Sequence, residues 1–219
     1  RPAGPVHARW PAPAPGEAAV KVRDQRRAAL LESLGELLQE SDLDSINIAD
    51  ISRRAGVTRS AFYFYFESKH LAVAALMDRV YDGAMLATAR FADPDLSPAE
   101  RVRGMVTTLF DTAEEHTHLF RAMLDARGQS PAVREMWDSD RQSFVGLVAD
   151  LVRTERAAGR APDGPDPDAL AAMLLELNDR ALERLTLGTL DRDALTEAVV
   201  SIWVRSIFAT DPATDLETA

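Results

Sequence analysis

Hydrogen-bonding side chains gather in one short stretch of this chain, and their types suit contact with a nucleic acid. The segment 48–66 is predicted to form two short helices joined by a turn at Gly56, because apolar residues recur at helical spacing on both sides of that glycine. The outward face of the second helix would present Thr58, Arg59, Ser60 and Tyr63. Hydroxyl and guanidinium groups at this spacing suit base edges and phosphates in a major groove. An ordinary helical hairpin is the alternative interpretation.

Side chains suited to catalysis or to metal binding form no comparable group. His116 and His118 lie beside Glu114 and Glu115, but residues two apart on a helix point to different faces, so we expect no metal site. The absence of cysteine excludes thiolate chemistry and disulfides. No phosphate-cradling glycine loop or serine elbow is present, and no carboxylate pair has an evident apolar pocket. The sequence therefore predicts neither an enzyme nor a bound cofactor.

Helix-start and helix-stop signals define the elements that would hold these side chains. Asn47, with Asp50 three residues on, is typical of the N-cap of one short helix, and Thr58 of the N-cap of the next. Later starts combine a cap with proline at Ser97-Pro98, Ser130-Pro131 and Asp166-Pro167. Helix stops are expected at Gly128, Gly159 and Gly188. About nine helices and no alternating strand follow, so the predicted fold class is all-α.

Composition and charge limit where such a protein can act. The net charge is −10, but residues 1–70 carry ten Lys/Arg and nine Asp/Glu, and residues 71–219 carry fifteen and twenty-six. The acid therefore lies in the second part, and DNA binding needs only a local basic face. No apolar run approaches the length of a membrane span and no signal peptide is evident. We expect a soluble cytoplasmic protein with no membrane partner.

The chain divides into four predicted segments. Residues 1–20 contain five prolines among alanines and are predicted to be a disordered tail, with helical periodicity beginning at Val22. Residues 21–68 would form the helix-turn-helix unit. Residues 69–210 would form a second helical domain, and residues 211–219 a second tail.

An aromatic run makes the helix-turn-helix interpretation more specific. The stretch 56–69, which includes Phe62-Tyr63-Phe64-Tyr65-Phe66 and Ser68-Lys69, resembles the signature of TetR-type repressors. The resemblance implies that Thr58, Arg59, Ser60, Tyr63 and Tyr65 face DNA, and that Lys69 grips a phosphate where Ser68 caps the fourth helix. The predicted DNA-binding set is therefore Asn47, Thr58, Arg59, Ser60, Tyr63, Tyr65, Ser68 and Lys69. Phe62, Phe64 and Phe66 are predicted to be core residues.

The C-terminal part shows three apolar stripes at helical spacing. They run through Val133–Leu151, Leu170–Leu185 and Ala198–Ile207, and such stripes form either core, a dimer interface or the wall of a ligand cavity. Asn178 lies inside the second stripe, where a buried amide must find partners. It would form an interhelical hydrogen bond, lie on the dimer seam or bind a ligand.

The resemblance extends through this domain to the EthR-type subgroup of the family. It is carried by Met77-Asp78-Arg79-Val80, Glu135-Met136-Trp137, Glu155-Arg156, Leu177-Asn178-Asp179-Arg180 and Ser201–Ile207. It implies a dimer formed by the last two helices and an apolar tunnel with Phe110, Trp137, Phe144, Asn178 and Trp203 at lining positions. Asp140, Arg141 and Glu183 stand where that subgroup has apolar or aromatic residues, so we expect a different ligand. Asp140 would make one end of the tunnel acidic or else lie at its rim or in solvent.

These expectations combine into one functional hypothesis with an alternative. The resemblance implies a repressor that binds operator DNA as a homodimer and is released by a small hydrophobic or amphipathic effector. Effector binding would reposition the fourth helix, from Ser68 to about Ala92. In the alternative, the same DNA-binding unit is joined to a bundle that binds a protein partner.

Overall fold

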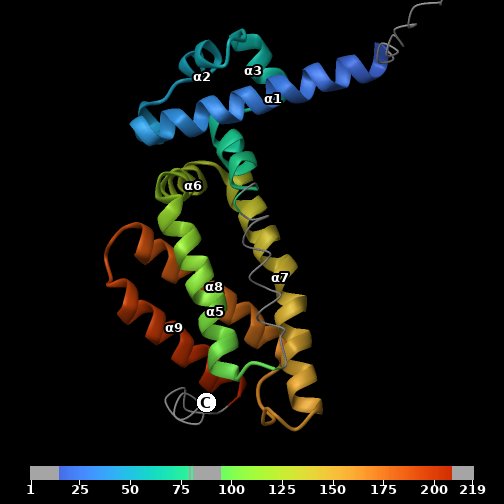
Figure 1. Ribbon diagram of the computed structural model, residues 1–219, viewed down its shortest axis with the longest axis vertical. Helices are drawn as coiled ribbons and strands as arrows, with labels where there is room; N and C mark the ends of the chain where they lie inside the picture. Colours follow the sequence, from blue (N-terminus) through green and yellow to red (C-terminus); the bar gives the residue numbers. More distant parts are fainter. Residues whose placement is uncertain (1–14, 79, 81–94, 209–219) are drawn as a thin grey trace, which may run out of the picture.

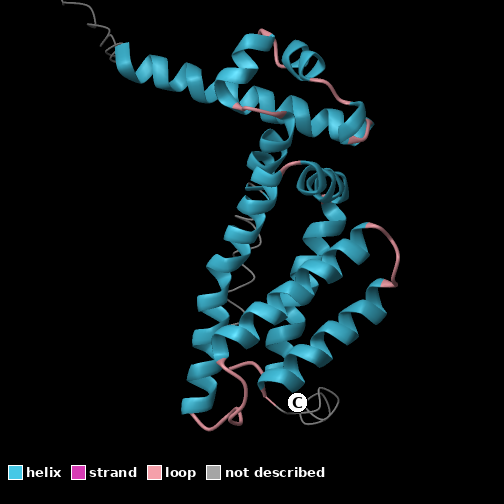
Figure 2. Ribbon diagram, turned by 180° about the vertical axis from the view of Figure 1, so that it is seen from behind, coloured by secondary structure: helices cyan, strands magenta, loops and turns pink. Residues whose placement is uncertain are grey.

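The computed structural model describes residues 15–78, 80 and 95–208, and every regular element in these ranges is helical (Figures 1 and 2). The elements are α1 Pro15–Glu40, η1 Leu43–Ser45, α2 Ile48–Arg54, α3 Arg59–Tyr65, α5 Pro98–Glu115, α6 Thr117–Gln129, α7 Pro131–Ala157, α8 Pro167–Thr186 and α9 Arg192–Ile207. Residues 69–78 form the described part of a further helix. The all-α prediction is confirmed.

Two predicted boundaries differ from the structure or lie beyond it. Helix α1 begins at Pro15, whereas helical periodicity was expected from Val22 and residues 1–20 were predicted to be a tail. Proline is well suited to a first helical position, and the Glu and Ala residues after it favour a helix. Residues 1–14 and 211–219 of the predicted tails lie outside the described residues. The part of the fourth helix expected beyond residue 80 lies outside them as well.

The predicted caps begin the helices as expected. The side-chain oxygens of Asn47 and Thr58 accept from the backbone N–H groups of Asp50 and Ala61, at 3.0 and 3.2 Å. Ser97 and Glu100 form the reciprocal capping box, and Ser130 and Asp166 also cap their helices. Gly56, Gly159 and Gly188 have positive φ values of 66°, 71° and 63° and follow helix ends. Gly128 differs from the prediction, because it lies within α6.

The helices form two connected layers. Helices α2 and α3 lie on one side of α1, and the remaining helices form a bundle on its other side, in which α7 packs on α8 and α5 packs on α9 (Figure 1). The N-terminal half of α1 projects well beyond α3 in both views (Figures 1 and 2). Helix α6 contacts both α1 and η1, so the bundle touches the helix-turn-helix unit directly.

One continuous core joins both layers. It extends from Leu30 in α1 through Phe62 in α3 to Trp203 in α9, all of which are buried. Several members of the predicted apolar stripes are exposed instead: Met136, Leu147, Met173 and Ile202 are between 37% and 64% exposed. No described helix is long and apolar enough to cross a membrane.

Candidate nucleic-acid interface

Helix α3 is short, and its apolar side fixes how it lies on the molecule. Phe62 is fully buried and its ring packs at 5.7 Å from that of Phe66, which is also buried. Thr58 caps the first turn, so the backbone N–H of Ala61 is satisfied at the exposed end of the helix. The residues on the opposite side of α3 therefore face solvent.

The outward side of α3 carries the polar groups that the sequence predicted. Thr58, Arg59 and Ser60 are exposed, and Tyr63 is 47% exposed. The Arg59 guanidinium lies 5.8 Å from the Tyr63 ring centre and donates to the Tyr63 hydroxyl at 3.4 Å, and the hydroxyls of Thr58 and Ser60 are 3.0 Å apart. A guanidinium with neighbouring hydroxyls can donate to guanine edges and to phosphate oxygens.

Phe64 corrects one prediction about this helix. It was predicted to be core, but it is 69% exposed, and the Arg23 guanidinium of α1 lies 5.6 Å from its ring centre. On a helix, residues two apart point to nearly opposite sides, so Phe64 cannot share the buried side of Phe62 and Phe66. Tyr65 is half-buried and packs edge-on against Phe64. The structure thus adds an exposed aromatic ring to the outward side of α3, which sequence reasoning missed.

Three further predicted DNA-contact residues have structural partners within the chain. Asn47 caps α2, and the Ser68 hydroxyl accepts from the Leu71 backbone N–H at 3.2 Å. The Lys69 ammonium donates to the backbone carbonyls of Leu43 and Ile46, at 2.6 and 2.9 Å. In the single chain the Lys69 ammonium is thus turned towards η1, and its phosphate contact stays a prediction.

Ion pairs determine which cations of the helix-turn-helix unit can meet phosphates. Arg54 donates to both carboxylate oxygens of Glu40, at 2.7 and 2.9 Å, and this contact lowers the pKa of Glu40. Arg53 pairs with Asp50 on the same helix. Arg59 on α3 and Arg23 on α1 contact aromatic rings instead and form no ion pair with a described carboxylate, so their charges can meet phosphates.

The predicted ligand-lining residues are largely buried in the C-terminal bundle. Phe110 and Trp203 are fully buried, Trp137 and Asn178 are 7% and 8% exposed, and Phe144 is half-buried. Asn178 accepts a hydrogen bond from the Trp203 indole N–H at 3.0 Å. Of the alternatives for Asn178, the structure contains the interhelical hydrogen bond.

Trp137 lies in a charged network that the sequence did not reveal. Its indole N–H donates to Asp179 at 2.8 Å, and Arg141 donates to the same carboxylate oxygen at 2.8 Å. The Arg127 guanidinium lies 5.1 Å from the Trp137 ring centre and 3.7 Å from Glu183. Arg141 and Glu183 are two of the three charged residues at positions where the EthR-type subgroup has apolar or aromatic ones. Both are thus paired with residues of opposite charge.

Asp140, the third of these charged residues, is exposed on α7. The acidic tunnel end proposed for it is therefore not supported, and the solvent-exposed alternative describes its position.

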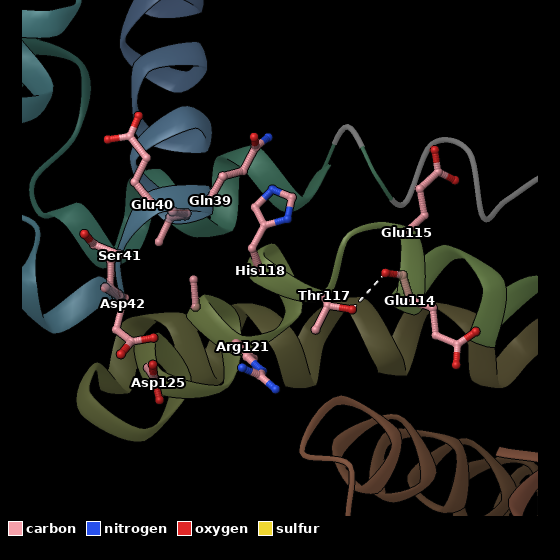
Figure 3. Close-up of a pocket in the computed structure, with 13 residues that line it drawn as sticks. Gln39, Glu40, Ser41, Asp42, Glu114, Glu115, Thr117, His118, Arg121 and Asp125 are labelled. Carbon is pink, nitrogen blue, oxygen red and sulfur yellow. Dashed lines mark hydrogen bonds between the residues drawn. The ribbon is translucent and has the colours of Figure 1, made fainter. Parts of the chain in front are cut away.

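A cavity lies where the bundle meets the helix-turn-helix unit. Its volume is about 540 Å³, and it is lined by the end of α1, the residues up to Leu43, and parts of α5 and α6 (Figure 3). The His118 side chain points towards Gln39 at the end of α1 (Figure 3). Burial and the nearby His116 lower the pKa of His118.

The cavity differs in chemistry from the predicted tunnel. Carboxylates and polar groups dominate its lining, and none of the five predicted ligand residues belongs to it. Within the described part of the chain, no group of three or more His, Asp or Glu side chains is arranged to hold a metal ion. The cavity is therefore a polar junction between the two layers.

Comparisons with known proteins agree with this architecture. Residues 30–75 match the family "Bacterial regulatory proteins, tetR family", and residues 102–209 match "Transcriptional regulator EthR, C-terminal domain". The HTH-type transcriptional regulator EthR of Mycobacterium tuberculosis is 31% identical over 190 residues, which are 84% of this chain and 88% of that protein.

Two solved structures share the fold. A TetR-family transcriptional regulator from Rhodococcus sp. superposes with a TM-score of 0.65 at 17% identity, covering 83% of this chain and 98% of the other. The SmeT–triclosan complex superposes with a TM-score of 0.63 at 21% identity, covering 82% of this chain and 90% of the other.

Proposed function

Since the chain belongs to the TetR family of transcriptional regulators and has an EthR-type C-terminal domain, we propose that it is a ligand-responsive repressor that binds operator DNA as a homodimer. As a member of this family it is a DNA-binding regulator and not an enzyme. We assign DNA binding to residues 21–68, and effector binding and dimerisation to residues 69–210. This function would place it with the chromosome in the cytoplasm.

The outward side of α3 is the observation that carries the DNA-binding part of the proposal. A buried Phe62 fixes the helix, and Arg59 and Tyr63 project from it beside the hydroxyls of Thr58 and Ser60. These groups match the donors that proteins use in the major groove. Asn47, Tyr65 and Ser68 would support the reading surface through capping and packing rather than through base contacts.

The exposed apolar residues of α8 and α9 support the dimer. Met173 and Ile202 are 64% and 44% exposed in the single chain. Ala198 and Ala194 lie one and two helical turns before Ile202 on α9, and their small side chains allow a second helix to approach closely. Pairing of these helices with their copies would bury this apolar surface and place two α3 helices in successive major grooves, about 34–36 Å apart.

The effector is proposed to bind within the bundle. Phe110, Trp137, Phe144 and Trp203 supply aromatic surface of the kind that lines small-molecule cavities, with Asn178 among them. Because Asn178 and Trp203 bind one another, an effector that contacts Asn178 must compete with that hydrogen bond. In one form of the dimer, the helix from residue 69 would hold the two α3 helices at a separation that does not fit the operator. The effector would act by binding this form better than the DNA-binding form.

The test is a fluorescence-anisotropy titration against the DNA upstream of the chain's own gene and its divergent neighbour. Arg59→Ala and Tyr63→Ala should each weaken specific binding by about 1–3 kcal/mol, the usual value of one base-reading contact. Arg153→Ala is the matched control, since Arg153 lies on α7 and pairs with Asp150 of the same helix and Asp168 of α8, away from α3. Equal binding by all four proteins, or no specific binding by the wild type, would count against the proposal.

Effector release can be tested with one defined probe. Triclosan is held by the SmeT complex that shares this fold, so it is a suitable first aromatic molecule. Release of operator DNA at saturating triclosan would support the repressor mechanism. Tight binding of triclosan without any loss of operator affinity would contradict the coupling between the two sites.

A further inference from the structure

The cavity between the bundle and the helix-turn-helix unit has the size and length of a small-molecule site. Its volume of about 540 Å³ lies within the range of about 300–1,000 Å³ that is usual for ligand pockets. Two of its lining residues, Thr117 and Asp125, are eight positions apart on α6, so their backbones are about 12 Å apart along the helix. The end of α1 lines the opposite side. The cavity is therefore elongated and bounded by both layers.

Its negative charge is only partly compensated. Five carboxylates line it, and two of them, Glu40 and Glu114, pair with arginines of α2 and α9. The other three, Asp42, Glu115 and Asp125, form no ion pair with a basic residue in the part of the chain that the structure describes. All three are exposed, so their charges are accessible to a ligand.

The three unpaired carboxylates lie at the two ends of the cavity. Asp42 and Asp125 lie at one end and Glu115 at the other (Figure 3). Neutral polar groups lie between them, since Gln39 and His118 occupy the middle (Figure 3). Burial and the nearby charge of a second histidine lower the pKa of His118, so its ring is uncharged at pH 7. The cavity thus has two anionic ends and an uncharged polar middle.

Like charges face one another at the first end. Burial and then the charges of Asp44 and Asp42 raise the pKa of Asp125. Gln129 donates to the Asp44 carboxylate at 2.8 Å, but an amide is uncharged and leaves the negative charge in place. A cation bound between Asp42 and Asp125 would replace this repulsion by attraction.

The arginine in the lining does not supply that cation. Arg121 donates through Nε to the Thr186 carbonyl of α8 at 3.4 Å. In Figure 3 its guanidinium points away from the His118 ring and from the two ends of the cavity. The compensating charge at Asp42 and Asp125 must therefore come from a bound molecule.

We propose that the cavity binds a linear aliphatic polyamine, with one ammonium group between Asp42 and Asp125, another at Glu115, and the chain lying across His118 and Gln39. The Gln39 amide oxygen and the neutral imidazole can each accept a hydrogen bond from an inner amine. Asp42 belongs to the helix-turn-helix side, and Asp125 and Glu115 belong to the bundle. The ligand would therefore tie the two layers together, at a site that shares no residue with the effector site proposed in the bundle.

Calorimetric titration of the full chain with spermidine at pH 7 and fixed ionic strength tests the site. Spermidine is a triamine, and putrescine is a diamine too short to reach both ends. We expect one spermidine per chain, bound at least tenfold more tightly than putrescine. Asp42→Asn combined with Asp125→Asn should weaken spermidine binding at least tenfold, and Glu115→Gln at least threefold, as expected for exposed ion pairs. Asp163→Asn, in the exposed loop between α7 and α8, is the control and should change nothing.

A thermal measurement separates loss of the site from loss of the fold. The Asp42 side chain makes no capping hydrogen bond, and removing the Asp125 charge removes a repulsion, so the double variant should fold. Spermidine should raise the melting temperature of the wild type and of Asp163→Asn, but not that of the double variant.

Three results would overturn the proposal. These are equal affinities for spermidine and putrescine, equal binding by the double variant and the control, and an equal rise in melting temperature with magnesium chloride at matched ionic strength, which would mean charge screening only. Neither measurement uses DNA. A failure to bind operator would therefore contradict the proposed function and leave this test unaffected.

Discussion

Glu155 provides the most stringent test of how the bundle is held together. Its carboxylate is 2% exposed and accepts from Arg101 at 3.1 Å and from Arg160 at 2.8 Å. Arg101 is itself 3% exposed, and its guanidinium lies 5.2 Å from the Phe208 ring centre, so α5, α7 and the end of α9 meet at this ion pair. We predict that Glu155→Leu is strongly destabilising.

The expected magnitude follows from which partner is buried. Glu155→Leu leaves the Arg101 guanidinium buried without a counter-charge, which costs about 3–5 kcal/mol. The Arg160 side chain is 55% exposed, so water replaces its contact, and Arg160→Ala should cost only about 0–1 kcal/mol. For a chain of this size, a loss of about 3–5 kcal/mol corresponds to a melting temperature lower by about 6–20 °C.

The assay is urea unfolding followed by circular dichroism at one fixed protomer concentration, because dimerisation would make stability concentration-dependent. The double variant Arg101→Met, Glu155→Leu removes both charges and should recover most of the loss. If Glu155→Leu costs no more than Arg160→Ala, or if the double variant is as unstable as the single one, the buried pair does not stabilise the bundle as argued.

The pH dependence of Glu155 has a definite sign. Hydrogen bonds from Arg160 and then Arg101 hold its pKa below the usual 4.5 despite burial. The stabilisation is therefore fully present above pH 4.5 and is lost as the pH falls through the lowered pKa. Wild type and Glu155→Leu should converge in stability over that acidic range.

Further predictions concern the other parts of the chain. Asn178→Ala removes the hydrogen bond that the buried Trp203 indole N–H donates and should lower the free energy of unfolding by about 1–3 kcal/mol, measured by urea unfolding, with no change if the amide serves only a ligand. Phe64→Ala should change stability by less than about 0.5 kcal/mol because the ring is exposed, and a weaker operator complex in anisotropy would assign the ring to DNA. Ile202→Glu should shift the chain to a monomer in analytical ultracentrifugation, and an intact dimer would refute the α8–α9 interface. Burial and two nearby carboxylates raise the pKa of Asp125 above its usual 3.8, so its ionisation lowers stability as the pH rises through that interval; Asp125→Asn should therefore raise the melting temperature at pH 7, and a lower one would contradict the repulsion.

Local signals in the sequence predicted the helices well, because each cap is made by a side chain and a backbone group three residues away. The caps at Asn47, Thr58 and Ser97 form as predicted. The prediction for Phe64 was wrong because an alternating aromatic run on a helix cannot bury all its members. The helical period was sufficient to show this.

Contacts between distant parts of the chain could not be predicted in the same way. Lys69 binds carbonyls 23 and 26 residues earlier, and Trp137 binds Asp179, 42 residues later. Nothing in the local pattern around Lys69 indicates that its ammonium turns towards η1, and a surface lysine at a helix start looks equally suited to a phosphate. Only the packing of η1 against the helix from residue 69 brings the Lys69 ammonium to the carbonyls of Leu43 and Ile46.

The continuous core has a consequence for building hybrid regulators from this chain. The simplest hybrid joins the DNA-binding domain of one regulator to the ligand-binding domain of another at the residue where the first domain ends in sequence. Here α6 packs on α1 and η1, and buried residues from both parts of the chain, among them Leu30 and Phe208, belong to one core. A hybrid joined at residue 69 would replace α6 with a foreign helix. The apolar surface of α1 and η1 would then face side chains that do not fit it. A hybrid that keeps α6 together with residues 21–78 preserves this contact. The unit that can be exchanged in this fold is therefore defined by which helices pack together and not by their order in the chain.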